Sequence, residues 1–265
     1  MKISTLLVLL LFCLMAIIGK KKGIKSFVAL FCNYFMIAVS VVLISWHVNV
    51  PFLIGLNVLG ILSINLFFIN QLNVKTVSAF FATLVTLMIS AGFIDLIVKY
   101  AMIQGFGEEQ QDTISGFTLN IGINFAAVSV FVVAISSIGA MIDASMSISS
   151  SMYQVLEMNP NLGSQKLLNA GMKIGRDIIG TTTNTLYFAL IGGYLTLMIW
   201  FKTLNYSFEN IINSKIFAGE ILTLLVGAAS VVLVIPITAL LSSYLFIGYR
   251  QRQEKKDSGS SGETR

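Results

Sequence analysis

Residues 139–184, GAMIDASMSISSSMYQVLEMNPNLGSQKLLNAGMKIGRDIIGTTTN, place polar and charged side chains between two long apolar stretches of the chain. Asp143 interrupts the first stretch, and an Arg-Asp pair, three threonines and Asn184 lead into the second. Runs of about 18 or more apolar residues on either side have the length of a membrane-spanning helix. This region therefore predicts an all-α membrane protein with polar chemistry inside the bilayer.

The composition of the whole chain agrees with this interpretation, since 56% of its 265 residues are hydrophobic, 11% are charged and three are proline. Lipid offers the backbone no hydrogen-bond partners, and long runs without alternation favour helices over a barrel. We expect a polytopic helix bundle over residues 1–249 and a disordered tail over 250–265, first basic and then rich in Ser and Gly. The seven expected spans are residues 3–19, 27–46, 51–70, 76–98, 122–152, 181–201 and 217–248.

The 17 basic residues lie at the ends of the expected spans and form no single patch. This distribution is typical of topology determinants at a lipid bilayer and not of nucleic-acid binding. With the amino terminus outside, 13 of the 17 basic residues fall on the inner side, a bias of about three to one. The pattern predicts a multi-pass protein with its N-terminus outside and its C-terminus in the cytoplasm.

Few residues outside the polar region suggest chemistry. Cys13 and Cys32 lie within apolar spans and lack the spacing of a metal site or a redox pair. His47 falls at a membrane interface, where an anchoring role is favoured over proton transfer or metal binding. A serine-rich helix offers no base for a nucleophile, and His47 lies at the wrong depth to supply one. We therefore expect no enzyme activity, no cofactor and no metal site.

Helical spacing places five small or polar residues on one stripe of the fifth span: Ser136, Gly139, Asp143, Ser147 and Ser150. This stripe must face protein or water, because a charged side chain at the bilayer centre costs about 2.5 to 3.5 kcal/mol on insertion scales. We expect Asp143 to titrate and to serve a proton or ion relay together with Ser147. The alternative is a protonated or hydrogen-bonded aspartate that only holds two helices together.

Four polar residues share one face at the start of the sixth span: Asp177, Thr181, Asn184 and Thr185. Thr181 and Asn184 are expected to face the fifth span, where they could hydrogen-bond Asp143 or coordinate an ion. Arg176 and Asp177 are expected at the inner interface, either in an ion pair with the connector or in support of the relay. The role of these two residues stays open.

The connector at about 160–175 predicts an amphipathic helix along the inner surface, because Leu167 and Met172 alternate with Lys166 and Lys173. A simple interfacial linker is the alternative.

Three weaker patterns concern packing and partners. The third span carries Asn57 and Gly60 among other small or amide residues, which favours close helix approach and hydrogen bonds across helices. Asp95 and Lys99 lie four residues apart, so an ion pair on one helix face is expected. The polar loop at residues 105–116 is a candidate contact surface for a partner.

Two segments carry a family resemblance: GAMIDASMSISSSMYQVLEMNP at 139–160 and GMKIGRDIIGTTTNTLYFALIGG at 171–193. Together with KKKGIKS at 20–26 and EEQQDTISG at 108–116, they resemble the YibE/F family of bacterial membrane proteins. The similarity covers most of the chain, which looks like a short, YibF-type member. The resemblance implies a bacterial cytoplasmic membrane and a YibE-type partner that carries an extracytoplasmic domain.

A more distant likeness is to one transmembrane half of an RND-type permease. Gly139 and Asp143 match a G-x-x-x-D motif, and residues 181–183 match a threonine-rich helix start. The likeness implies that spans two to seven form a six-helix half and that Asp143 carries a proton. The chain lacks the adjacent second aspartate and the porter domain that complete such a permease.

Two functions from different classes are compatible with these patterns. The first is a membrane subunit of a proton-coupled transporter or exporter complex, in which protonation of Asp143 shifts the packing of spans five and six. The alternative is a non-transporting scaffold or receptor subunit of a cell-envelope complex, whose polar core only locks helices together.

Overall fold

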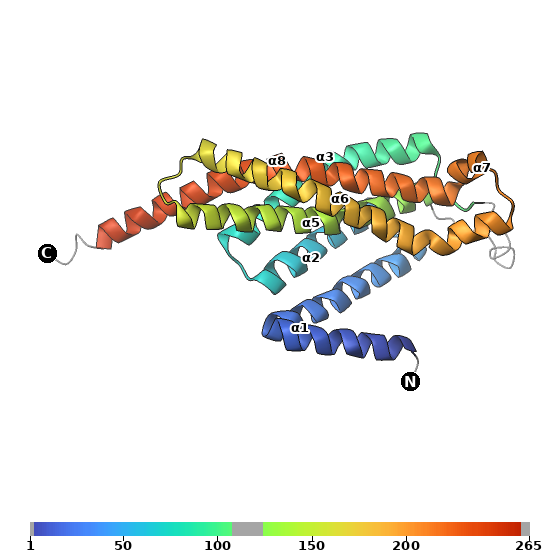
Figure 1. Ribbon diagram of the computed structural model, residues 1–265, viewed down its shortest axis with the longest axis horizontal. Helices are drawn as coiled ribbons and strands as arrows, with labels where there is room; N and C mark the ends of the chain where they lie inside the picture. Colours follow the sequence, from blue (N-terminus) through green and yellow to red (C-terminus); the bar gives the residue numbers. More distant parts are fainter. Residues whose placement is uncertain (1–2, 108–123, 261–265) are drawn as a thin grey trace.

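The computed structural model describes residues 3–107 and 124–260, and helices make up nearly all of these two segments. Figure 1 shows long helices that run side by side along one axis, with α1 set apart from the rest. The elements are α1 (Ile3–Ser45), α2 (Val50–Ser63), the π-helix η1 (Ile64–Phe68), α3 (Val74–Ala101), α5 (Phe125–Met158), α6 (Ser164–Thr203), α7 (Phe208–Asn213) and α8 (Lys215–Ser260).

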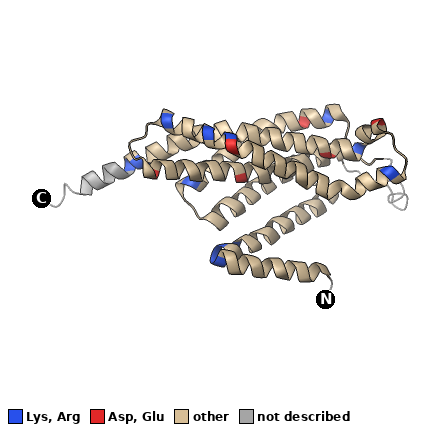
Figure 2. Ribbon diagram, viewed as in Figure 1, with Lys and Arg blue, Asp and Glu red and all other residues tan. Residues whose placement is uncertain are grey.

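Six helices within these segments are long and apolar enough to cross a membrane, with α2 and η1 counted as one. The predicted all-α bundle of about seven spans is confirmed, because the first two spans form the two arms of one bent helix, α1. The charged residues lie mainly toward the helix ends and at the bend of α1, as Figure 2 shows. Long apolar helices with charged ends make this a multi-pass membrane protein.

The bend of α1 falls at Lys20, whose positive φ of 47° is incompatible with a continuous helix. Gly23 then lies against the backbone carbonyl of Met15, at a place where any side chain would collide. The two arms fold back on each other, so that the rings of Phe12 and Phe27 have centroids 4.8 Å apart. The sequence predicts two separate spans here, and the structure joins them with almost no loop.

Helices α3, α5 and α8 pack against one another in the centre of the bundle. Their contact faces combine aliphatic side chains with buried hydroxyl groups that satisfy each other across the interfaces. Three hydroxyl pairs join these helices, with the following distances between oxygens: Ser78 to Ser242, 2.7 Å; Thr83 to Ser145, 2.9 Å; Ser90 to Ser230, 3.3 Å.

Helix α6 is continuous and differs from the predicted arrangement of a surface helix at about 160–175 followed by a separate span. Gly171 and Gly175 explain the difference, because they let this first part of α6 pack along the bundle. Ala239 and Met152 lie against Gly171, and Ile235 occupies the space beside Gly175. The apolar face of this segment packs on α8 and does not lie on the membrane surface, where the sequence predicts it.

Asn57 of α2 is fully buried and bonds to α1 and to a carbonyl of its own helix. Its Nδ2 donates to the Ser40 hydroxyl of α1 at 2.6 Å and to the Leu53 carbonyl at 2.8 Å. Gly60 lies against the side chain of Met36, where a β-carbon would collide. The predicted use of amides and small residues for helix packing in this span is confirmed.

The last helix is longer than predicted. The sequence predicts a span at 217–248 and a disordered tail from residue 250, but α8 continues to Ser260. Arg, Gln, Glu and Lys at 250–256 favour a helix, whereas Asp257, Ser258 and Gly259 favour it less. Residues 261–265 and most of the predicted contact loop at 105–116 lie outside the described residues.

Candidate functional site

A single narrow stripe of α5 is exposed between residues 131 and 154. Its members recur every three, four or seven residues: Val132, Ser136, Gly139, Asp143, Ser147 and Gln154. Only Val132 is a large apolar residue, and Asp143 lies near the middle of the 34-residue helix. The structure therefore places four of the five predicted stripe residues on the outer surface of this chain and not in the interior of its bundle, and Ser150 is half-buried.

The opposite face of α5 carries a second set of serines that sequence reasoning missed. Ser145 is buried against Thr83, and the Ser149 hydroxyl donates to the Lys75 carbonyl at 2.9 Å. Ser137 is also buried and donates to its own helix. The interleaved spacing of the two serine sets was the available signal, but spacing alone does not tell which set faces inward.

Helix α6 also has a polar outer face. Asp177, Gly180 and Asn184 are exposed and lie opposite the face that packs on α8 through Gly171 and Gly175. No atom of another part of the described chain lies within 4 Å of a β-carbon built at Gly180 or at Gly139. Both glycines are therefore open gaps in a surface made of small and polar groups.

Two of the threonines at the start of the sixth span bond to their own helix. The Thr181 hydroxyl donates to the Ile178 carbonyl at 3.0 Å, and the Thr185 hydroxyl donates to the Thr181 carbonyl at 2.9 Å. Their hydroxyl protons are thus occupied, while the oxygen atoms can still accept a hydrogen bond.

Asp143, Ser147 and Asn184 form no side-chain hydrogen bond with any described residue. The relay residues of the prediction are thus not joined by hydrogen bonds within one chain. Arg176 and Asp177 form no ion pair with any described residue.

The predicted pair of Asp95 and Lys99 is confirmed, with Lys99 Nζ 2.7 Å from Asp95 Oδ2 on the surface of α3. This ion pair lies outside the polar stripes.

The two polar stripes lie at matching depths, because α5 and α6 are antiparallel and joined by a short turn at 159–163. At 1.5 Å per residue, Asp143 lies about 22 Å from the end of α5 and Gly180 about 24 Å from the start of α6. By the same measure, Gly139 lies at about 28 Å and Asn184 at about 30 Å. A side chain on one helix is therefore level with a glycine on the other.

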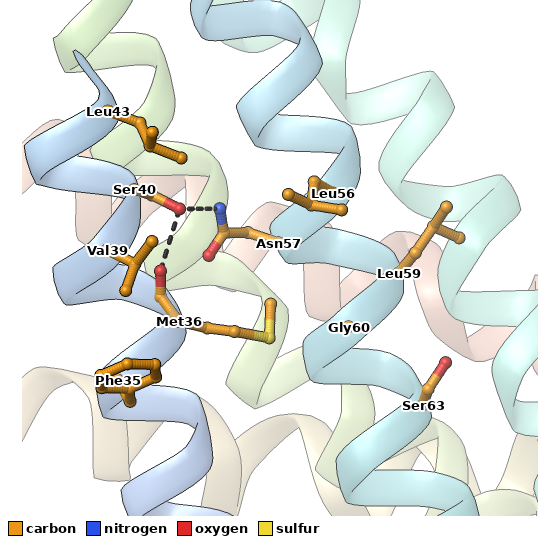
Figure 3. A pocket seen from close by; sticks show the side chains of 10 residues that line it. All are labelled: Phe35, Met36, Val39, Ser40, Leu43, Leu56, Asn57, Leu59, Gly60 and Ser63. Carbon is orange, nitrogen blue, oxygen red and sulfur yellow. Dashed lines mark hydrogen bonds between the residues drawn. The ribbon is translucent and has the colours of Figure 1, made fainter. Parts of the chain in front are cut away.

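A groove of about 410 Å³ lies between the second arm of α1 and α2, and it is mostly apolar. Figure 3 shows the side chains that line it, among them Phe35, Leu56 and Leu59, with Asn57 bonded to Ser40 at its floor. Its shape and composition suit a hydrocarbon chain. It contains no titratable group, so it is not part of a proton relay.

The described residues contain no group of three or more His, Cys, Asp or Glu side chains that could hold a metal ion. Together, the long apolar helices, the apolar groove and the polar stripes at mid-helix define a polytopic α-helical protein of the membrane. A family model for YibE/F-like proteins matches residues 7–248. The chain therefore belongs to the YibE/F-like family. Neither the curated proteins nor the solved structures compared with the chain gave a match.

Proposed function

We propose that this chain is a membrane subunit of a proton-coupled transporter or exporter complex, with Asp143 as its protonation site. The observation that carries the proposal is the carboxyl group at the middle of α5, which has no hydrogen-bond partner in the described chain. The contacts that hold the bundle together use other residues. Asp143 can therefore gain or lose a proton without breaking them, and an ionisable residue at this depth is rarely without function.

Ser147, Thr181 and Asn184 are the proposed neighbours of Asp143 in the relay. Ser147 and Asn184 have free hydrogen-bonding groups, and Thr181 keeps an oxygen that can accept. Gly139, Arg176 and Asp177 would support the relay, since Gly139 leaves space beside the acid and the charged pair lies toward the inner end of α6.

A bacterial cytoplasmic membrane and an outside N-terminus are part of the proposal. The bend of α1, the α2–α3 connection, the α5–α6 turn and the C-terminal end of α8 lie toward the same end of the long axis (Figure 1). These regions carry most of the basic residues, which the positive-inside rule assigns to the cytoplasm. A YibE-type partner with an extracytoplasmic domain would supply substrate recognition, since the outer connections at 46–49 and 204–207 of this chain are short.

Proton movement in sealed vesicles tests the proposal. Vesicles that contain the intact complex are loaded with a pH-sensitive dye and challenged with a panel of candidate solutes. A solute that moves protons with the native chain should give only background signal with Asp143→Asn, at equal protein yield. Asp95→Asn is the matched control, because it removes an exposed acid of α3, and it should retain the native signal.

Labelling with an apolar carbodiimide gives a second readout that needs no substrate, because the reagent modifies protonated carboxyl groups in apolar surroundings. Asp143 should be modified and Asp95 should not. Full solute-driven proton movement in Asp143→Asn would refute the proposal and favour the scaffold alternative.

A further inference from the structure

Helices α5 and α6 pack against each other and both carry exposed polar and glycine residues, which we name together the α5–α6 seam. It consists of Ser136, Gly139, Asp143 and Ser147 of α5 and of Asp177, Gly180 and Asn184 of α6. The two helices pack side by side, as Figure 1 also shows. The seam therefore follows the middle part of both helices.

Lipid is a poor cover for the seam. Hydrocarbon tails cannot hydrogen-bond a carboxyl, an amide or a hydroxyl group, and an aspartate facing lipid at mid-depth costs about 2.5 to 3.5 kcal/mol on insertion scales. The glycines at 139 and 180 leave gaps that flexible tails fill badly, whereas a neighbouring helix packs closely against such residues.

The rest of the described chain does not cover the seam either. Helix α1 packs mainly on α2 and η1, and it meets α5 at the cluster of Ile44 and Phe131, away from the exposed stripe. Only 6% of the most apolar 18 residues of α6 are buried, whereas the corresponding value is 44% for α8. A spanning helix with so little burial, and with polar groups at its centre, calls for another protein surface.

The seam is complementary to itself. Asp143 is level with Gly180, and Asn184 is level with Gly139, so these two side chains each have a gap opposite them on the other helix. A two-fold axis along the membrane normal would pack α5 of each copy against α6 of the other copy, so that the same contact forms two times. Each Asp143 carboxyl group would then meet the amide and hydroxyl groups of the opposing α6, while the two Asp143 groups stay apart.

We propose that a second copy of this chain covers the α5–α6 seam, so that each proton site is completed by Asn184 and Thr181 of the other copy. This inference rests on the proposed function for the role of Asp143, but the pairing itself does not depend on transport. A YibE-type partner would then bind elsewhere on the chain.

Disulfide trapping in native membranes tests the pairing. Cys13 and Cys32, both exposed, are first replaced by alanine. Two differently tagged chains are co-expressed, one with Gly139→Cys and the other with Asn184→Cys, and the membranes are oxidised with copper phenanthroline. A disulfide-linked species with both tags is expected. The control pair combines Gly139→Cys with Met88→Cys on the exposed face of α3, and only background is expected there.

A steric variant gives an independent measurement. Gly139→Leu and Gly92→Leu both add a side chain at an exposed glycine with no described atom within 4 Å of the new β-carbon, so both variants should fold. Gly139→Leu should lower the dimer fraction of purified chain in vesicles by about tenfold or more, because it fills the gap for Asn184 of the other copy. Gly92→Leu should leave the dimer fraction unchanged.

The pairing is overturned if the two leucine variants behave alike, if the two cysteine pairs give equal yields, or if the seam cysteine is trapped with a different subunit. Loss of proton movement in Asp143→Asn without any pairing would sink this inference and leave the proposed function standing. Intact pairing with unchanged proton movement in Asp143→Asn would refute the proposed function and leave the pairing standing.

Discussion

Helices α3 and α5 both pack on α8, yet their exposed faces differ in composition. The exposed face of α3 consists of large apolar side chains such as Phe81, Met88 and Phe93, which are 50%, 73% and 60% exposed. The exposed stripe of α5 contains an acid, two serines and a glycine. An exposed face of a single membrane chain can therefore be covered in two ways. Lipid suits the apolar face of α3, and only protein or water suits the polar stripe of α5.

An aspartate scan is the strongest way to break this comparison. Met88→Asp places a charge on a face that meets lipid, so it should cost about 2.5 to 3.5 kcal/mol of insertion free energy. Ser136→Asp, on the polar stripe of α5, should cost less than half as much, because this stripe is covered by polar groups or water. Insertion efficiency, measured by glycosylation of an engineered acceptor site, distinguishes the two. Equal costs would mean that both faces meet lipid.

The two faces of α6 offer the next test. Gly175→Leu inserts a side chain where Ile235 already fills the space, and overpacking of this kind costs about 1 to 3 kcal/mol. Gly180→Leu adds the same side chain on the open outer face and should leave the stability of the single chain unchanged. Unfolding in mixed micelles, under conditions that keep the chain monomeric, measures both. A loss in Gly180→Leu would show that the outer face is packed within one chain.

A smaller effect is expected for the hydroxyl pair between α3 and α5. Thr83→Val and Ser145→Ala each remove one side of the contact at 2.9 Å. Each hydroxyl also lies within hydrogen-bond distance of a carbonyl of its own helix, and this carbonyl competes for its single proton. The coupling energy in a double-mutant cycle should therefore be only about 0.6 kcal/mol. A coupling near zero would mean that the buried face of α5 is held by apolar packing alone.

The smallest effect is expected at the surface ion pair of α3. Lys99→Ala removes the partner of Asp95, but both side chains are more than half exposed. The free energy of unfolding should change by no more than about 0.5 kcal/mol, and the difference should vanish in high salt. A larger, salt-resistant loss would indicate that this pair is covered in the assembled protein.

Much of the fold could be predicted from the sequence, because apolar runs of spanning length leave the backbone no alternative to helix. The connections could not. Lys20 adopts a positive φ that its residue type does not predict, and so two spans become a hairpin without a loop. Gly171 and Gly175 let an amphipathic segment pack closely on α8, although its hydropathy pattern predicts a helix on the membrane surface.

The sequence predicts which residues belong to the candidate site but not the direction in which they point. Helical spacing correctly groups Ser136, Gly139, Asp143 and Ser147, since spacing is a property of one helix. The direction in which that group points depends on neighbouring helices, and α5 carries a second serine set with equal spacing. Ser145 and Ser149 face the interior, where both bond to α3, so Asp143 faces outward.

The π-helix η1 is a place where the chain can lose a residue without disturbing the helix that contains it. A π turn holds one residue more than an α turn, so removal of a single residue from Ile64–Phe68 leaves an ordinary helix with its later faces unchanged. The same deletion in α5 ahead of residue 143 would rotate every later side chain by about 100° and turn the carboxyl group out of its stripe. Insertions and deletions among natural variants should therefore collect at this turn and be absent from α5.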